Sequence, residues 1–106
     1  SHHLGFGQLF RRSVLPDNVN CLAALGSSCV AVGTPDGVEI VSWNGSKCAR
    51  VSGFSAECLV SIGSATLAAG DEGGSVRVWH FRRSILKEVH KVEVHSNPVR
   101  VLANGG

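Results

Sequence analysis

Two pairs of arginines are the residues of this sequence best suited to bind a ligand. They occur in two similar segments that lie 71 residues apart, Phe10-Arg11-Arg12-Ser13-Val14-Leu15 and Phe81-Arg82-Arg83-Ser84-Ile85-Leu86. A guanidinium group donates two parallel hydrogen bonds to a carboxylate or a phosphate, which an ammonium group cannot do. The pairs therefore indicate binding of an acidic peptide, a phosphate group or a nucleic-acid backbone. The competing interpretation is of solvated turn residues that keep strand edges from pairing wrongly.

Catalytic chemistry is not indicated by any group of residues. Asp71 and Glu72 are adjacent carboxylates, but no acid or base partner is evident, and the glycines near the N-terminus precede no helix. The cysteines contain no C-x-x-C pair, so we expect four small buried side chains in a reducing compartment rather than a zinc site with some of the histidines. We expect no enzyme activity, no metal and no cofactor. The cysteines are Cys21, Cys29, Cys48 and Cys58.

Composition limits the class of protein. The chain has 106 residues, of which 43% are hydrophobic and 17% charged, so wholesale disorder is excluded. No apolar run approaches the length of a membrane helix, and a net charge of +2 does not by itself imply a nucleic-acid or membrane partner. We expect an intracellular protein of the cytoplasm, with the nucleus as an open alternative and no membrane partner.

The elements that must position these residues are strands. Helical periodicity is absent, whereas short β-branched runs alternate with turn residues. Thr34–Gly37 is typical of a tight turn. Asn44-Gly45-Ser46 matches a glycosylation motif, but Asn44-Gly45 is also typical of a hairpin turn, which we favour. The predicted strands are Val19–Leu25, Cys29–Gly33, Val38–Trp43, Lys47–Val51, Glu57–Ile62, Thr66–Gly70, Ser75–Phe81, Ile85–Val94 and Val99–Ala103.

These strands form an internal repeat. Leu22, Leu59 and Leu102 occupy equivalent places in three similar tripeptides and are separated by 37 and 43 residues. Val30–Gly33 superposes on Leu67–Gly70, and Val38–Val41 superposes on Val76–Trp79. Four short strands per unit of about 40 residues are typical of the blades of a β-propeller.

At these positions the sequence resembles the WD-repeat β-propeller family. Asp71–His80 is similar to the family's turn and third strand, although His80 stands where Asp is usual. His95–Val99 is similar to its Gly-His segment, with Val94 in place of Gly. Ala31 and Ala69 stand where the family often has Ser or Thr, so the resemblance implies divergent blades.

The resemblance implies an all-β fold of β-propeller blades, each a four-stranded antiparallel sheet, with an incomplete ring in this chain. Residues 1–18 would be outer strands of a preceding blade, 19–55 and 56–96 two full blades, and 97–106 the inner strand of a third. Because a propeller needs about 4–8 blades, further chain, other subunits or copies of this chain would complete the ring. A compact β-sandwich is the alternative fold.

The resemblance also implies a function, that of a non-catalytic scaffold for protein–protein interaction. Turns between third and fourth strands would share one rim, and this basic rim would carry Arg11, Arg12, Lys47, Arg82 and Arg83. A nucleic-acid or phosphate-binding module using that rim is the alternative function, and support of a catalytic chain elsewhere is a third. The opposite rim would be mildly acidic, with Asp36, Asp71 and Glu72.

The remaining singled-out residues are expected to be structural. Trp79 lies in the middle of a strand and is expected in the core, whereas Trp43, at a strand end, packs between blades or anchors a partner. By family analogy His95 hydrogen-bonds within a blade turn. Leu22, Leu59 and Leu102 would be buried on the inner strands.

Overall fold

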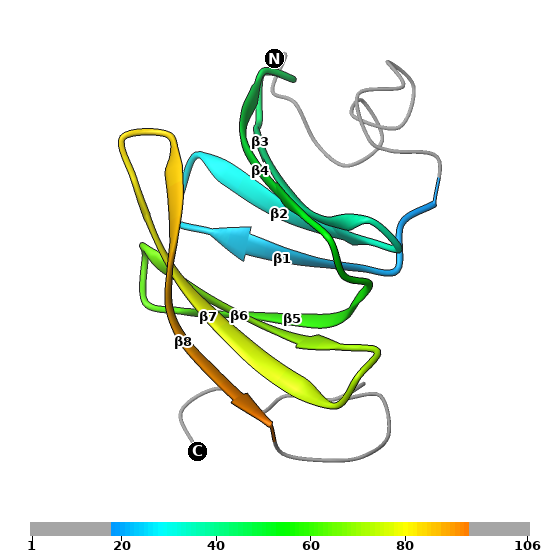
Figure 1. Cartoon of the computed structure of the whole chain (residues 1–106). Helices are drawn as coiled ribbons and strands as arrows, with labels where there is room; N and C mark the ends of the chain where they lie inside the picture. The colour runs from blue at the N-terminus through cyan, green and yellow to red at the C-terminus, as the bar shows by residue number, and fades with distance from the viewer. Residues whose placement is uncertain (1–17, 94–106) are drawn as a thin grey trace.

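The computed structural model describes residues 18–93, and this part of the chain consists of eight strands in two four-stranded antiparallel sheets (Figure 1). The first sheet has the order β1-β2-β3-β4 and the second the order β5-β6-β7-β8. The first comprises β1 (Cys21–Leu25), β2 (Cys29–Thr34), β3 (Gly37–Ser42) and β4 (Lys47–Ser52). The second comprises β5 (Ala56–Ile62), β6 (Thr66–Asp71), β7 (Ser75–Arg82) and β8 (Ile85–Glu93).

The all-β prediction is confirmed, and each strand expected within residues 18–93 is present with bounds that differ by at most two residues. In each sheet every strand pairs with its sequence neighbour, because two to four turn residues connect consecutive strands. The expected strand Val99–Ala103 and the outer strands assigned to residues 1–18 fall on or extend into segments outside the described residues. No helix long and apolar enough to cross a membrane occurs in residues 18–93.

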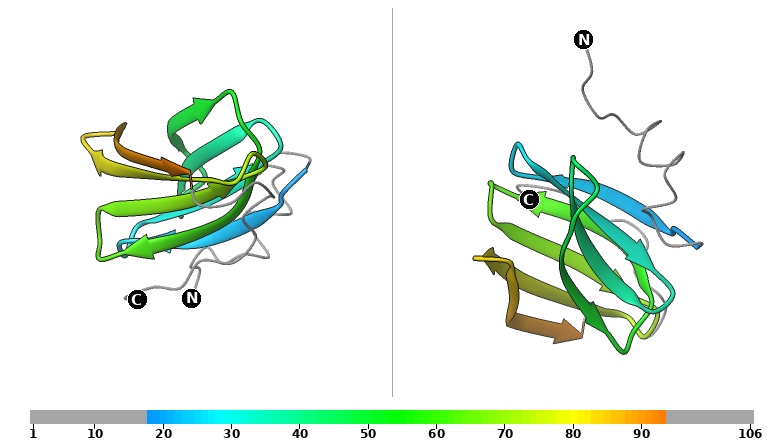
Figure 2. Two further views of the ribbon diagram at one scale, coloured as in Figure 1. Left: turned by 60° about the horizontal axis from the view of Figure 1, so that its bottom comes forward. Right: turned by 90° about the horizontal axis from the view of Figure 1, so that it is seen from above.

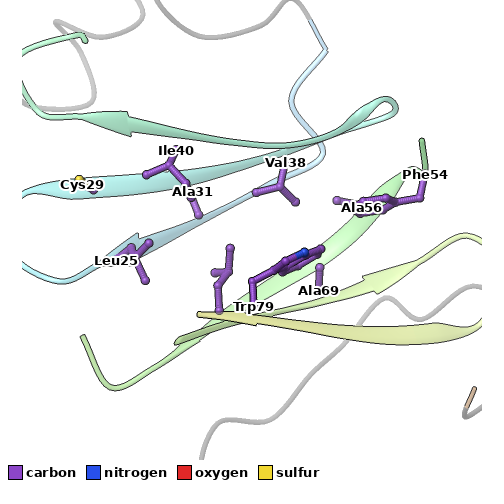
Figure 3. Packing of buried hydrophobic residues seen from close by; sticks show 10 residues of the cluster. Leu25, Cys29, Ala31, Val38, Ile40, Phe54, Ala56, Ala69 and Trp79 are labelled. Atoms are coloured by element: carbon purple, nitrogen blue, oxygen red, sulfur yellow. The ribbon is translucent and has the colours of Figure 1, made fainter. Parts of the chain in front are cut away.

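The two sheets pack face to face around one apolar core (Figure 3). The first sheet contributes Leu25, Ala31, Val38 and Ile40, and the second contributes Leu67, Ala69 and Trp79, with Phe54 and Ala56 at the connection between them. The Trp79 and Phe54 rings stack with their centroids 5.7 Å apart. Burial of these side chains is the main favourable contribution to the fold.

Two glycines lie where a neighbouring segment comes close, Gly33 at the contact between the sheets and Gly37 beside β4 of its own sheet. A Cβ atom at Gly33 would lie 2.3 Å from Cys21 Sγ and 3.1 Å from Ala56 Cβ, so glycine at this position leaves room for Ala56 of the second sheet. Gly37 begins β3 with φ +149°, and a Cβ atom there would lie 2.0 Å from the Val51 carbonyl oxygen. Both glycines are therefore required by close contacts rather than by flexibility.

The two central strands of the first sheet carry apolar side chains on both faces. Val30, Val32 and Val41 point away from the second sheet, are fully buried, and have Leu22 and Trp43 packed against them. We call this side of the first sheet its back face. The first sheet therefore has buried apolar side chains on both faces of its two central strands, β2 and β3.

Corresponding strands of the two sheets lie opposite each other. β5 contacts β1 and β2, and β8 contacts β4. The chain therefore leaves the first sheet at its edge strand β4 and crosses through Gly53–Ser55 to begin the second sheet beside β1 (Figure 2). Within residues 18–93 the two sheets form no closed ring.

Candidate interaction surfaces

The most highly organised polar group lies at the turn between β6 and β7. Asp71 is 3% exposed, and its Oδ1 atom accepts hydrogen bonds from the N–H groups of Gly73 and Ser75, both at 2.9 Å. Its Oδ2 atom accepts a 3.0 Å hydrogen bond from Arg77 Nε. Burial raises the pKa of Asp71, but the hydrogen bonds from Ser75, Arg77 and Gly73 outweigh it, so the pKa lies below its usual value.

Arg77 connects this carboxylate to the apolar core. Its guanidinium carbon lies 4.3 Å from the centroid of the Phe54 ring, and Nη1 lies 3.6 Å from Glu88 Oε1. Because Phe54 stacks on Trp79, the chain of contacts runs from the β6–β7 turn to the centre of the core. Sequence reasoning missed Arg77 and Phe54. The sequence pattern that could have identified Arg77 is the alternation of side chains along β7, which places Arg77 on the same face as Trp79.

The acidic rim expected at this end is mostly occupied by contacts within the fold. Asp71 points inward, and Glu72 Oε2 accepts a 2.7 Å hydrogen bond from the N–H group of Ser55. In the first sheet Thr34 takes the place of Asp71, since its Oγ1 atom accepts hydrogen bonds from the N–H groups of Asp36 and Gly37 at 3.1 Å. These side chains brace turns, and Asp36 remains exposed.

Three of the five residues predicted for the basic rim lie within residues 18–93, one on the first sheet and two on the second. Lys47 Nζ lies 3.6 Å from Glu39 Oε1 in the first sheet, so its charge is partly compensated. Arg82 and Arg83 lie at the β7–β8 turn, at the same end of the molecule as the β3–β4 turn (Figure 1). Arg11 and Arg12 lie outside the described residues.

The β7–β8 turn gathers two further basic residues that sequence reasoning missed. His80 pairs with Lys87 and Arg82 with Ile85, so these four side chains share one face of the hairpin. Together with Arg83 they line a shallow hollow, and all five are exposed. We call this group the basic hairpin: His80, Arg82, Arg83, Ile85 and Lys87.

The basic hairpin lies at one end of the face of the second sheet that points away from the first, because His80 and Arg82 continue the alternation of Val76 and Val78 along β7. We call this face the outer face of the second sheet. It is apolar at its centre, where Cys58, Val60, Ala68, Val76 and Val78 share the face by register. Cys58 and Ala68 are buried, whereas the three valines are only half-buried. At the edges of the face Ile62 and Val92 are 45% and 54% exposed.

Of the four cysteines predicted to be buried, Cys29 and Cys58 are buried, whereas Cys21 and Cys48 are only half-buried. Burial, with smaller contributions from Cys58 and Glu57, raises the pKa of Cys21 to about 11. Its thiol makes a weak 3.6 Å contact to the Ala56 carbonyl oxygen. In residues 18–93, no three or more His, Cys, Asp or Glu side chains are grouped closely enough to hold a metal ion.

The large apolar residues singled out from the sequence lie in the two clusters. Trp79 is 1% exposed in the core, and Leu59 packs against the same core. Leu22 and Trp43 pack on the back face of the first sheet. Leu22 and Leu59 were predicted to be buried, but both are only half-buried. His95 and Leu102 lie outside the described residues.

No protein-family model matches the sequence, and no curated protein matches it. The WD-repeat resemblance therefore remains a prediction that depends on the internal repeat and on the arrangement of the two sheets.

Proposed function

We propose that this chain is part of a WD-repeat-like β-propeller that acts as a non-catalytic scaffold for protein–protein interaction, and that further chain or other subunits complete the ring. The observation that carries the proposal is the equivalence of sheet faces under the internal repeat. Corresponding residues of the two units lie on corresponding faces, which supports a series of like sheets stacked in one direction.

The first sheet shows which face of a repeat unit packs against the next sheet. Cys21, Ala23, Ala31, Val38 and Ile40 lie on the face that the second sheet covers, and Val38 and Ile40 are 1% and 0% exposed. Their repeat equivalents form the outer face of the second sheet: Cys58, Val60, Ala68, Val76 and Val78. Val38 and Ile40, which the second sheet buries, therefore correspond to Val76 and Val78, which are only half-buried. Ala31 and Ala68 are buried in both units.

The opposite faces correspond as well. Leu22, Val30, Val32 and Val41 on the back face of the first sheet match Leu59, Leu67, Ala69 and Trp79, which the second sheet inserts into the shared core. Each sheet thus offers one face to the preceding neighbour and the other to the next. Such head-to-tail contacts leave a surface free at each end unless the series closes into a ring.

A β-sandwich accounts less well for this arrangement. Its two sheets would be covered on one face each, whereas β2 and β3 of the first sheet here are buried on both. The crossing from the edge strand β4 to β5 beside β1 is the connection that each successive blade of a propeller requires.

A binding function suits the chemistry of the described residues. Both oxygens of the buried Asp71 carboxylate are occupied by hydrogen bonds, and the raised pKa of Cys21 keeps its thiol protonated near neutral pH. Turns that are fixed in this way present their outer side chains in one arrangement, which lowers the entropic cost of binding a partner.

The proposal is tested by supplying a third sheet. A chain extended after Pro98 by a second copy of residues 56–93 is expected to unfold in one cooperative step, with a melting temperature several degrees higher, because the added sheet covers Val76 and Val78. The matched control carries Ser in place of the Leu59 and Trp79 equivalents of the added copy, and is expected to lose the gain. An added copy that remains unfolded without changing the melting temperature would contradict the proposal.

A further inference from the structure

We propose that the basic hairpin binds an acidic protein segment that carries an apolar side chain between its carboxylates. The inference rests on the proposed interaction function and names the chemistry of one partner. It concerns the turn that connects β7 and β8, which lies at the edge of the molecule (Figure 2).

The first observation is uncompensated positive charge. Arg82, Arg83 and Lys87 are exposed, and none forms an ion pair with a carboxylate of residues 18–93. Glu88 follows Lys87 but lies on the other face of β8, opposite Trp79, where its carboxylate lies 3.6 Å from Arg77. Among residues 18–93 the hairpin therefore presents a positive surface without a counter-charge, as a site for an acidic partner requires.

The second observation is that this arrangement costs stability. Lys87 pairs with His80 and lies diagonally across from Arg82 on the same face, which places two like charges close together. The turn itself has positive φ at two residues with side chains, 51° at Arg83 and 62° at Ser84. Asn-Gly would form such a two-residue turn with less strain. A sequence chosen for stability alone would not place an arginine there.

The third observation separates a protein partner from a polyanion. Ile85 lies directly opposite Arg82 within the cationic group and is 64% exposed, more than the other exposed large apolar residues of the described chain. A phosphate group or a nucleic-acid backbone offers this side chain nothing to pack against. A protein segment does, because an apolar residue between two carboxylates contacts Ile85 while the carboxylates accept hydrogen bonds from Arg82, Arg83 and Lys87.

The experiment measures binding of the full 106-residue chain to a labelled peptide of alternating Glu and Leu by fluorescence anisotropy. Wild-type chain is expected to bind this peptide and not its Gln analogue. Joint replacement of Arg82→Ser and Arg83→Ser is expected to weaken binding about fivefold to tenfold, and Ile85→Ser about threefold. Arg50→Ser, an exposed arginine on β4, is the matched control and is expected to leave the affinity unchanged.

A second variant separates binding from folding. The pair Arg83→Asn and Ser84→Gly gives the turn its preferred residues, so the melting temperature is expected to rise while the affinity for the acidic peptide falls. A parallel loss of stability and affinity would instead indicate that the turn acts through the fold, and would overturn the inference.

Two further results would overturn it. An affinity that is independent of Ile85, with a short single-stranded oligonucleotide bound as tightly as the peptide, would assign the hairpin to a polyanion. Absence of peptide binding, in a chain whose three-sheet extension folds cooperatively, would reject the site while leaving the scaffold function standing. Failure of the extension with peptide binding intact would reject the propeller arrangement alone.

Discussion

Replacing Asp71 with Asn removes the negative charge from the β6–β7 turn while keeping the shape of the side chain. The remaining carbonyl oxygen is still able to accept the hydrogen bonds of the Gly73 and Ser75 N–H groups. What is lost is the charge-assisted hydrogen bond from Arg77 Nε at 3.0 Å. The substitution therefore isolates the ion pair from the geometry of the turn.

The size of the effect follows from the surroundings of Arg77. Breaking a fully buried ion pair costs about 3–5 kcal/mol, and losing one hydrogen bond to a charged group costs about 1.5–3 kcal/mol. The lower range applies because the Arg77 side chain is 20% exposed and Glu88 lies 3.6 Å away as a second carboxylate. We expect Asp71→Asn to lower the free energy of unfolding by about 2 kcal/mol and the melting temperature by about 10 °C.

The effect depends on pH in a defined direction. The pKa of Asp71 is lowered in the folded chain, so its ionised form adds stability that is present above the pKa of the unfolded carboxyl group and is lost as the pH falls through the folded value. The difference in stability between wild type and Asp71→Asn should be fully developed at neutral pH. It should shrink below about pH 4.

Urea unfolding followed by tryptophan fluorescence is a suitable assay, because Trp79 is buried one contact away from Arg77 through Phe54. Asp36→Asn is the matched control, since Asp36 is an exposed carboxylate at the corresponding turn of the first sheet and the change is expected to stay within about 0.5 kcal/mol. An Asp71→Asn variant as stable as wild type at neutral pH, or a difference that grows toward acid pH, would refute the reasoning.

Two further variants or treatments test the core and the thiols. Leu59→Asp should abolish soluble folding because it places an unpaired charge against the core; circular dichroism checks this, and a well-folded variant would contradict the strand register. Cys21, with its pKa raised to about 11, should react slowly with iodoacetamide at pH 8 and faster above pH 10 in the folded chain. Rapid labelling of Cys21 at pH 8 would contradict the raised pKa, and unfolded chain is the control.

The strands were predictable because local signals agree with the fold. Short apolar or β-branched runs bounded by turn residues mark the strands between residues 18 and 93. The repeat also identified equivalent positions, so that Leu22 and Leu59 lie on equivalent faces of their sheets. These features depend on neighbours in sequence, which a single chain displays directly.

Contacts set by cross-strand register were not predictable in the same way. His80 pairs with Lys87 because the turn between their strands has two residues, Arg83 and Ser84. Neither residue type is common in such a turn, so the sequence did not predict its length. The contact of Lys47 with Glu39 depends on a bulge between Ile40 and Val41, which moves Lys47 to the face that carries Glu39. A shift by one residue reverses the face of every side chain, so such contacts need the structure.

The central claim is that the outer face of the second sheet receives another sheet. Light scattering after size exclusion, across a tenfold range of concentration, tests it most directly on this chain. The account predicts a mass above the 11.1 kDa of one chain, because association buries the half-exposed side chains of Val76 and Val78. The mass is expected to return to 11.1 kDa in Val78→Glu but not in Lys91→Glu, a control on the edge strand β8. A folded wild-type monomer at every concentration would contradict the claim.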